Sequence, residues 1–241
     1  MDFARQKKKK GVPGLFRGVF ALLLLLASLP SPAPAQGGKE PPSLAELVTA
    51  FREERRLPAK GRLPTVARIT ARRGAEVVGF LLAELPREEP GPVENRMARA
   101  LADRLGREGV VQALPGLWSG LAPAARRALC AALDPPLPPA ARPFFRDLFA
   151  RPGTPVALRR HLVRPLALPP RPESLPLLRR VLEEESDYIL LRNAAGCLAQ
   201  LPPSPARLEV VELLLGMAHP MLVAAGIESL PGDDRPWLLR Q

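Results

Sequence analysis

Arginines recur along this sequence at nearly even spacing, and arginine is the side chain best suited to bind carboxylate and phosphate groups. Its planar guanidinium group can donate two parallel hydrogen bonds to such an anion. An evenly spaced series therefore predicts one of two roles: a ladder that binds an extended anionic partner, or a set of links between repeated structural units. The series consists of Arg96, Arg127, Arg159 and Arg192, which lie 31, 32 and 33 residues apart.

Other reactive side chains are sparse and form no recognisable catalytic or metal-binding pattern. The only cysteines are Cys130 and Cys197, and the only histidines are His161 and His219. The sequence contains no nucleophile elbow, zinc-protease motif, phosphate-binding loop or dinucleotide-binding fingerprint. The acidic pair Asp233–Asp234 supplies too few oxygen ligands for a hard cation, so we expect a solvated turn there. The sequence predicts no catalytic residue, no metal site and no cofactor.

Helix starts recur with the same period as the arginines. Proline is tolerated in the first turn of a helix, where its missing N–H would have no partner in any case. A period of about 32 residues is typical of stacked helix pairs, in which each unit buries its apolar face against its neighbours. No segment alternates apolar and polar residues over the length of a strand, so we predict an all-α fold, an α-solenoid of about six antiparallel helix pairs. The period is marked by Pro92, Pro123, Pro155, Tyr188 and Pro220.

Six units follow from this period, and an independent series of apolar residues supports their boundaries. The first unit begins with the capping-box pattern Ser43–Glu46, in which each side chain can bond the backbone N–H of the other residue. Each unit then has an apolar residue late in its first helix. The units are 43–73, 74–106, 107–134, 137–168, 171–202 and 204–231, and the apolar residues are Phe51, Leu85, Leu117, Leu148, Leu182 and Leu214.

The repeat period also separates the two cysteines. Cys130 and Cys197 fall on the second helices of units two repeats apart, which corresponds to roughly 20 Å at the usual spacing of packed helices. A disulfide requires Cα atoms within about 7 Å. We therefore expect two buried, unpaired thiols. We also expect His219 to cap a helix, His161 to lie on a groove or surface, and the tryptophans Trp118 and Trp237 to pack against helices.

The fifth unit resembles the HEAT-repeat family, including its short bacterial PBS-lyase-like variant. The resemblance is carried by the segment Asp187–Leu198, DYILLRNAAGCL, with arginine five residues after the aspartate and alanine three residues later. In that family such Asp and Arg side chains link adjacent repeats, so the resemblance implies a structural role for Asp187 and Arg192. It extends roughly over residues 43–231. It implies a non-enzymatic scaffold that binds a protein along the groove lined by its second helices. The alternative is a lyase-type enzyme or ligand chaperone of the bilin-lyase-like branch, handling a tetrapyrrole or another anionic ligand.

The N-terminal segment has the features of a secretory signal. A basic stretch precedes the apolar run Val19–Leu29, which at about 11 residues is shorter than the roughly 20 needed to span a membrane. Small residues at Ala33 and Ala35 match a signal-peptidase site, with cleavage expected before Gln36. We therefore predict a signal peptide at 1–35, a flexible linker at 36–42 and a HEAT-like repeat domain at 43–241. An uncleaved membrane anchor over residues 19–29, outside which the repeats would lie at the cell envelope, is the alternative. The basic stretch contains Arg5, Lys7 to Lys10 and Arg17.

The leader accounts for part of the positive charge. Without residues 1–35 the chain keeps 29 basic and 23 acidic side chains, so the net charge falls from +11 to +6. A periplasmic or extracellular protein meets little nucleic acid, and we expect no nucleic-acid partner. The expected partner is a protein, with an acidic surface as one option, and a membrane is expected only if the leader is uncleaved.

Overall fold

The computed structural model describes residues 41–107, 109–171 and 173–230, and within these ranges it consists of helices and loops without a strand. The predicted all-α fold is confirmed. The helices are α2 (Leu44–Glu53), α3 (Ala59–Ala71), α4 (Ala75–Glu84), α5 (Pro92–Ala102), α6 (Val110–Gly120), α7 (Pro123–Ala131), α8 (Arg142–Ala150), α9 (Val156–Ala167), α10 (Ser174–Glu184), α11 (Tyr188–Leu198), α12 (Pro205–Leu215) and α13 (Pro220–Ser229), with short 3₁₀ helices η1 (Glu54–Arg56) and η2 (Leu85–Arg87).

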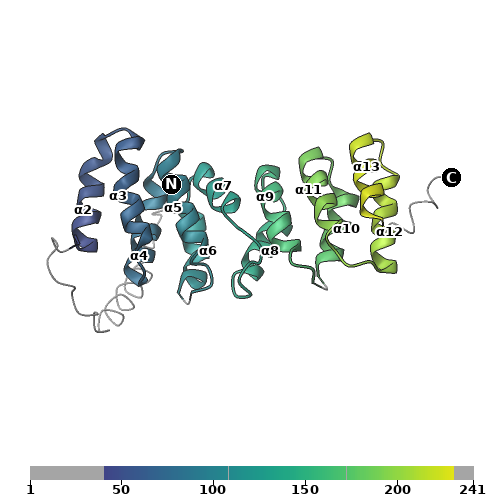
Figure 1. Ribbon diagram of the computed structural model, residues 1–241, viewed down its shortest axis with the longest axis horizontal. Coiled ribbons are helices and arrows are strands. Elements are labelled where there is room, and N and C mark those ends of the chain that lie inside the picture. The colour runs from purple at the N-terminus through teal and green to yellow at the C-terminus, as the bar shows by residue number, and fades with distance from the viewer. Residues whose placement is uncertain (1–40, 108, 172, 231–241) are drawn as a thin grey trace, which may run out of the picture.

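The odd-numbered helices form one continuous row. In chain order, α3 contacts α5, α5 contacts α7, α7 contacts α9, α9 contacts α11 and α11 contacts α13. Even-numbered helices pack beside this row, with α2 on α3, α4 on α5, α8 on α9, α10 on α11 and α12 on α13. Figure 1 shows the helices side by side along the long axis of the molecule, from α2 to α13. Within the row, α5, α9 and α11 are each flanked by two odd-numbered helices and packed against even-numbered ones, which leaves one side of each exposed, whereas α7 packs mainly against α5 and α9.

The helix starts follow the local signals in the sequence. Pro92, Pro123 and Pro220 are the first residues of their helices, and Tyr188 is the first residue of α11. The Ser43 hydroxyl accepts a hydrogen bond from the Glu46 N–H at 3.2 Å, and the Glu46 carboxylate accepts one from the Ser43 N–H at 2.6 Å. The predicted capping box at the start of α2 is thus formed.

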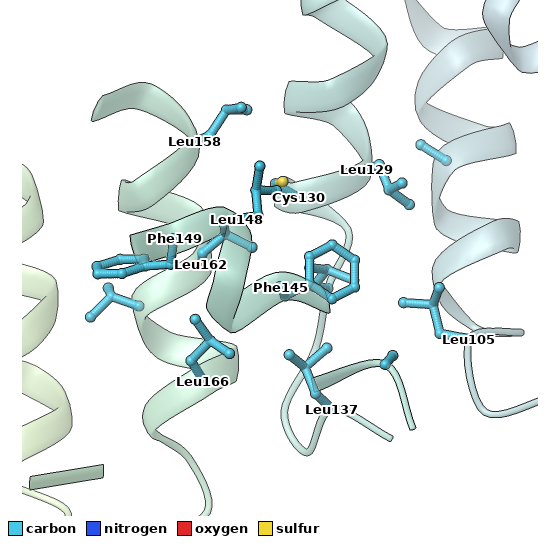
Figure 2. Packing of buried hydrophobic residues seen from close by; sticks show 14 of the residues in the cluster. Leu105, Leu129, Cys130, Leu137, Phe145, Leu148, Phe149, Leu158, Leu162 and Leu166 are labelled. Atoms are coloured by element: carbon cyan, nitrogen blue, oxygen red, sulfur yellow. The ribbon is translucent and has the colours of Figure 1, made fainter. Parts of the chain in front are cut away.

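The core lies between the odd-numbered row and the even-numbered helices. Around α7, α8 and α9 it is built from leucine and phenylalanine side chains, with Cys130 among them (Figure 2). Full burial of such a side chain contributes roughly 1.5–3 kcal/mol. Trp118 is buried and meets Phe144 edge to face at a centroid distance of 5.9 Å, which confirms its packing role. Leu105, Leu129, Leu137, Phe145 and Leu162 are among the residues that are almost completely buried.

Ion pairs fasten the first helices to the next ones along the chain. Glu84, at the end of α4, is fully buried and accepts hydrogen bonds from Arg52 at 2.6 Å and from Arg55 at 2.5 Å. Glu88 is also buried and accepts one from Arg62 of α3 at 2.9 Å. Because a buried carboxylate is costly without partners, these three arginines hold the α2–α3 end firmly against α4 and η2.

Several of the predicted features lie outside the described residues. These are the signal-cleavage residues Ala33 and Ala35, the apolar run at 19–29, the acidic pair Asp233–Asp234 and Trp237. Among the helices that the structure describes, none is long and apolar enough to cross a membrane.

Candidate binding surface

The structure places the four predicted arginines on four consecutive helices of the odd-numbered row, α5, α7, α9 and α11. Arg96, Arg127 and Arg192 are exposed, whereas Arg159 is half-buried. Since these helices contact one another in order, the three exposed arginines share the open side of the row.

Arg159 departs from the predicted series because it is already paired. Its guanidinium group forms an ion pair with Glu185, the residue that follows α10. Its Nε atom is buried without a hydrogen-bond partner in the described structure. Arg159 therefore links α9 to the end of α10 and is not offered to an external anion.

The other three arginines of the series make few internal contacts. Arg96 donates one long hydrogen bond, 3.4 Å from Nε to the Thr70 hydroxyl oxygen of α3. Arg127 and Arg192 form no ion pair or side-chain hydrogen bond within the part of the chain that the structure describes. The structural role that the HEAT resemblance implies for Arg192 is thus not supported by its contacts, because its charge faces outward.

Asp187 does connect neighbouring elements, but through a different arginine. It is the N-cap of α11, where its carboxylate accepts a hydrogen bond from the Leu190 N–H at 2.9 Å and another from Arg160 Nε of α9 at 2.8 Å. The bond from Arg160 is the largest cause that lowers the pKa of Asp187 to about 2; burial opposes it, and the weaker effect of the backbone bond from Leu190 adds to the lowering. Asp187 therefore stays ionised and ties α11 to α9.

Most internal arginine links come from residues that the evenly spaced series does not include. Arg104 is buried and donates to the backbone carbonyls of Thr70 at 2.8 Å and Arg72 at 3.0 Å, joining the end of α5 to the end of α3. Arg126 donates to the Trp118 carbonyl at 3.1 Å and lies 5.6 Å from the centre of the Trp118 ring. Two of the linking residues, Arg126 and Arg160, directly adjoin a member of the series.

Two exposed arginines that the sequence analysis missed complete the set. Arg68 lies on α3 and Arg164 on α9, and both are exposed and without an ion pair in the described ranges. Helical spacing could have indicated Arg164, because it lies one turn beyond Arg160. We call the set of five exposed arginines, one on each helix from α3 to α11 in the odd-numbered row, the cationic face. Its members are Arg68, Arg96, Arg127, Arg164 and Arg192.

Acidic residues are almost absent from the helices that carry the cationic face. Within the odd-numbered helices the only acidic residues are Glu94 and Glu228. Glu94 is buried and accepts a hydrogen bond from the Gly91 N–H at 3.2 Å, so it does not neutralise the face. The acidic residues of the described helices are therefore concentrated on the even-numbered ones, which carry arginines as well. The even-numbered helices carry Glu46, Glu53, Glu76, Glu84, Asp147, Glu183, Glu184, Glu209 and Glu212.

His161 lies within this positive region. It is exposed on α9, as expected for a surface residue. Partial desolvation, then the charges of Arg160 and Arg127, lower its pKa below the usual value. Because a lowered histidine pKa favours the neutral ring, His161 adds no charge to the face at neutral pH and protonates only in acid.

The same open side becomes apolar at its C-terminal end. Ile189 on α11 and Met221 on α13 are 42% and 61% exposed, and we call this pair the apolar end. Ile189 precedes Arg192 by three residues, so the two side chains are neighbours on the surface of α11. Tyr188 and His219 stack with ring centroids 4.4 Å apart, which brings the first turns of α11 and α13 together. His219 stands at the predicted N-cap position of α13, but its side chain makes no capping hydrogen bond.

The described residues offer neither a thiolate nucleophile nor a metal-binding cluster. Burial raises the pKa of the Cys130 thiol to about 12 and that of Cys197 to about 11, so neither is a thiolate nucleophile near neutral pH. Both are buried and unpaired, as predicted. Across the described ranges no three His, Cys, Asp or Glu side chains gather closely enough to hold a metal ion.

Two surface hollows lie beside the odd-numbered row. One is lined by residues of the loops around η1 and η2, with Arg55, Arg62 and Glu88 as its charged groups nearest the core. The other lies between the 150–153 loop and the end of α10 and contains the paired residues Arg159 and Glu185. Neither lining includes a histidine, cysteine, serine or tyrosine.

Comparison of the chain with protein-family models, with curated proteins and with solved structures finds no match. The HEAT resemblance therefore rests on the residues of the segment Asp187–Leu198.

Proposed function

We propose that this protein is a non-enzymatic α-solenoid of HEAT-like helix pairs that binds a protein partner on the open side of its odd-numbered row. The six pairs would be α2 with α3, α4 with α5, and so on to α12 with α13. The observation that carries the proposal is the cationic face, five exposed arginines on successive helices whose own acidic residues are almost absent. A broad, mainly positive surface of this kind favours association with a partner of opposite charge, although exposed Asp134 pairs with Arg99 of α5 beside it.

The spread of the exposed arginines over five helices favours a scaffold over a lyase-type enzyme. A bilin-lyase-like site would need a pocket with converging polar groups, whereas the face is open and its cations are spread over five helices. Binding by surface shape and charge requires only that the helices hold these arginines in place, which their packing in the row does.

Differential capture tests the proposal. Three forms of the purified protein are immobilised and exposed to an extract of the exported proteins. They are the wild type, a triple variant with Arg96→Glu, Arg127→Glu and Arg192→Glu, and the control variant Arg146→Glu. Arg146 is an exposed arginine of α8, outside the odd-numbered row. We expect a protein that binds to the wild type and the control but not to the triple variant. Recovery of a small coloured ligand alone, or equal recovery from all three, would reject the proposal.

We further propose that the chain is exported and that its leader is removed before Gln36. Mass spectrometry of the protein recovered outside the cytoplasm should give a mature N-terminus at Gln36. A full-length chain retained in the membrane fraction would support the anchored alternative instead.

A further inference from the structure

We infer that the segment bound by the odd-numbered row is an acidic polypeptide that ends in a short apolar anchor. Its acidic residues would lie over the cationic face and its anchor over the apolar end. This inference rests on the proposed function, because it assigns the chemistry of the partner at that same surface.

The charge of the partner follows from the face itself. Five exposed arginines without internal ion pairs repel one another, and a partner that supplies carboxylates removes that repulsion while gaining charge-assisted hydrogen bonds. Exposed acidic side chains on the same helices would weaken such a partner's binding, but Glu94 is buried and only Glu228, on the last helix, is exposed.

The spacing of the arginines suits an extended chain. Adjacent packed helices lie about 8–10 Å apart, and a chain in the extended polyproline II conformation advances about 3.1 Å per residue with three residues per turn. In that conformation every third side chain lies on the same side of the chain, so one acidic residue in every three matches the spacing of the helices. From α3 to α11 the face spans four such steps, which corresponds to roughly 12 residues of partner.

The apolar end distinguishes a polypeptide from other polyanions. Polyphosphate, acidic polysaccharide and nucleic-acid backbones have no aliphatic side chains to cover Ile189 and Met221, whereas leucine or phenylalanine residues in a peptide can do so. The one aromatic side chain nearby, Tyr188, already has a face occupied by the His219 ring, so it is a poor platform for stacking a nucleobase. Because α13 carries no basic residue, the anchor lies at one end of the acidic segment rather than within it.

Fluorescence anisotropy with synthetic peptides tests the inference. The first peptide has glutamate at every third position over twelve residues and a Leu-Leu-Phe anchor. It is made in two versions, with the anchor at the N-terminus or at the C-terminus, because the face does not fix the direction in which the peptide runs. In the second peptide serines replace the anchor, and in the third glutamines replace the glutamates. Inorganic polyphosphate of equal charge is the competitor.

We expect the acidic peptide with an anchor, in one of its two orders, to bind on the order of tenfold more tightly than the serine peptide. Ile189→Ser with Met221→Ser should abolish this difference and leave the affinity of the serine peptide unchanged. Arg96→Glu with Arg127→Glu should weaken both peptides by about tenfold, and replacement of the same arginines by lysine should largely preserve binding. The controls Arg146→Glu on α8 and Leu208→Ser on α12, at exposed positions away from the face, should change nothing.

The inference is wrong if the anchor adds no affinity, if the glutamine peptide binds as well as the acidic one, or if polyphosphate binds more tightly than the anchored peptide. If differential capture still finds a protein on the face in that case, the proposed function stands and only the partner's chemistry is wrong. If neither capture nor any peptide shows binding to the face, both proposals fail.

Discussion

Asp187 illustrates how one side chain can both start a helix and hold two helices together. Its carboxylate caps α11 and accepts from Arg160 of α9, and Asn193 strengthens the same contact by donating from its amide to the Arg160 carbonyl at 2.9 Å. The bond from Arg160 depends on the negative charge of the Asp187 carboxylate, whereas the cap on the Leu190 N–H requires only an oxygen acceptor. Substitution of Asp187 can therefore separate the contribution of the ion pair from that of the cap.

We predict that Asp187→Ala destabilises the fold by about 1 kcal/mol through the lost cap, and that Asp187→Asn costs less because asparagine caps helices as well as aspartate does.

The pKa of Asp187 is lowered to about 2, below the roughly 3.9 of an unfolded chain. The stabilisation from its charge is therefore present above about pH 4 and is lost as the pH falls toward 2. Urea unfolding should give a higher free energy of unfolding for the wild type than for the Asp187→Asn variant at pH 7, and this difference should become smaller near pH 3. A difference that does not change with pH would contradict the prediction.

The reactivity of Cys130 and Cys197 tests whether their thiols are buried and unpaired. Both side chains are almost completely covered, and burial raises the pKa of each thiol. We predict that a thiol reagent at mildly alkaline pH leaves both unmodified in the native protein and modifies both, without prior reduction, in denaturing urea. Rapid reaction of either thiol under native conditions would show that its helix opens locally. Failure of both to react in urea would indicate a disulfide.

The contacts between helices determine whether a glycine within a helix can be replaced by a larger residue. Gly226 lies where α13 approaches α12, and a Cβ atom there would stand 3.1 Å from Leu215 Cδ2 and 3.2 Å from Leu214 Cβ. Gly196 of α11 is exposed, and a Cβ atom there would meet nothing within 4 Å. Both glycines thus lie within helices, but a side chain would have free space at Gly196 and close neighbours at Gly226.

The same substitution should therefore have opposite effects at these positions. Gly196→Ala should stabilise the protein by about 0.5–1 kcal/mol, because alanine loses less backbone entropy in a helix. Gly226→Ala has the same gain but must push α12 and α13 apart, and overpacking costs about 1–3 kcal/mol, so a net loss is expected. Thermal unfolding of both variants measures the difference, and stabilisation by Gly226→Ala would mean that Leu215 moves aside freely.

Helix starts were more predictable than helix interiors. Pro92, Pro123 and Pro220 begin helices as expected, but Pro64 lies within α3, whose start at Ala59 the sequence did not indicate. Tertiary contacts sustain this helix, because Val66 and Ile69 are fully buried and Arg62 is bound by Glu88. An internal proline is tolerated where packing compensates for the lost hydrogen bond.

Different ion pairs stabilise the first and the last described helices. At the N-terminal end, the buried carboxylates of Glu84 and Glu88 bind three arginines from the preceding elements. At the C-terminal end, Arg179 of α10 contacts Glu209 of α12 at 3.5 Å, and both side chains of this pair are exposed. An exposed ion pair contributes little to stability.

We predict that α12 and α13 open first. In an array whose elements contact only their neighbours, stability is a sum of local terms, and a terminal pair of helices, which has neighbours on one side only, exchanges before the middle. The N-terminal pair is held in addition by the buried carboxylates of Glu84 and Glu88. Hydrogen exchange followed by mass spectrometry should show the fastest exchange among the described helices in α12 and α13 and the slowest in the central helices α7 to α9. Uniform protection from α2 to α13 would indicate a single cooperative unit and contradict the prediction.

The sequence by itself determined that the chain is helical, where several helices begin and that the two cysteines stay apart. These properties depend on local signals, namely apolar spacing, capping residues and first-turn prolines, which act over one or two turns. The tertiary structure decided which arginines are exposed. Arg126 and Arg127 are adjacent, yet one bonds the Trp118 carbonyl and the other faces outward, and Arg159 is paired where Arg164 is not. A step of one residue turns a helix by about 100°, so only the packing of neighbouring helices determines which side chains form the cationic face and where it becomes apolar.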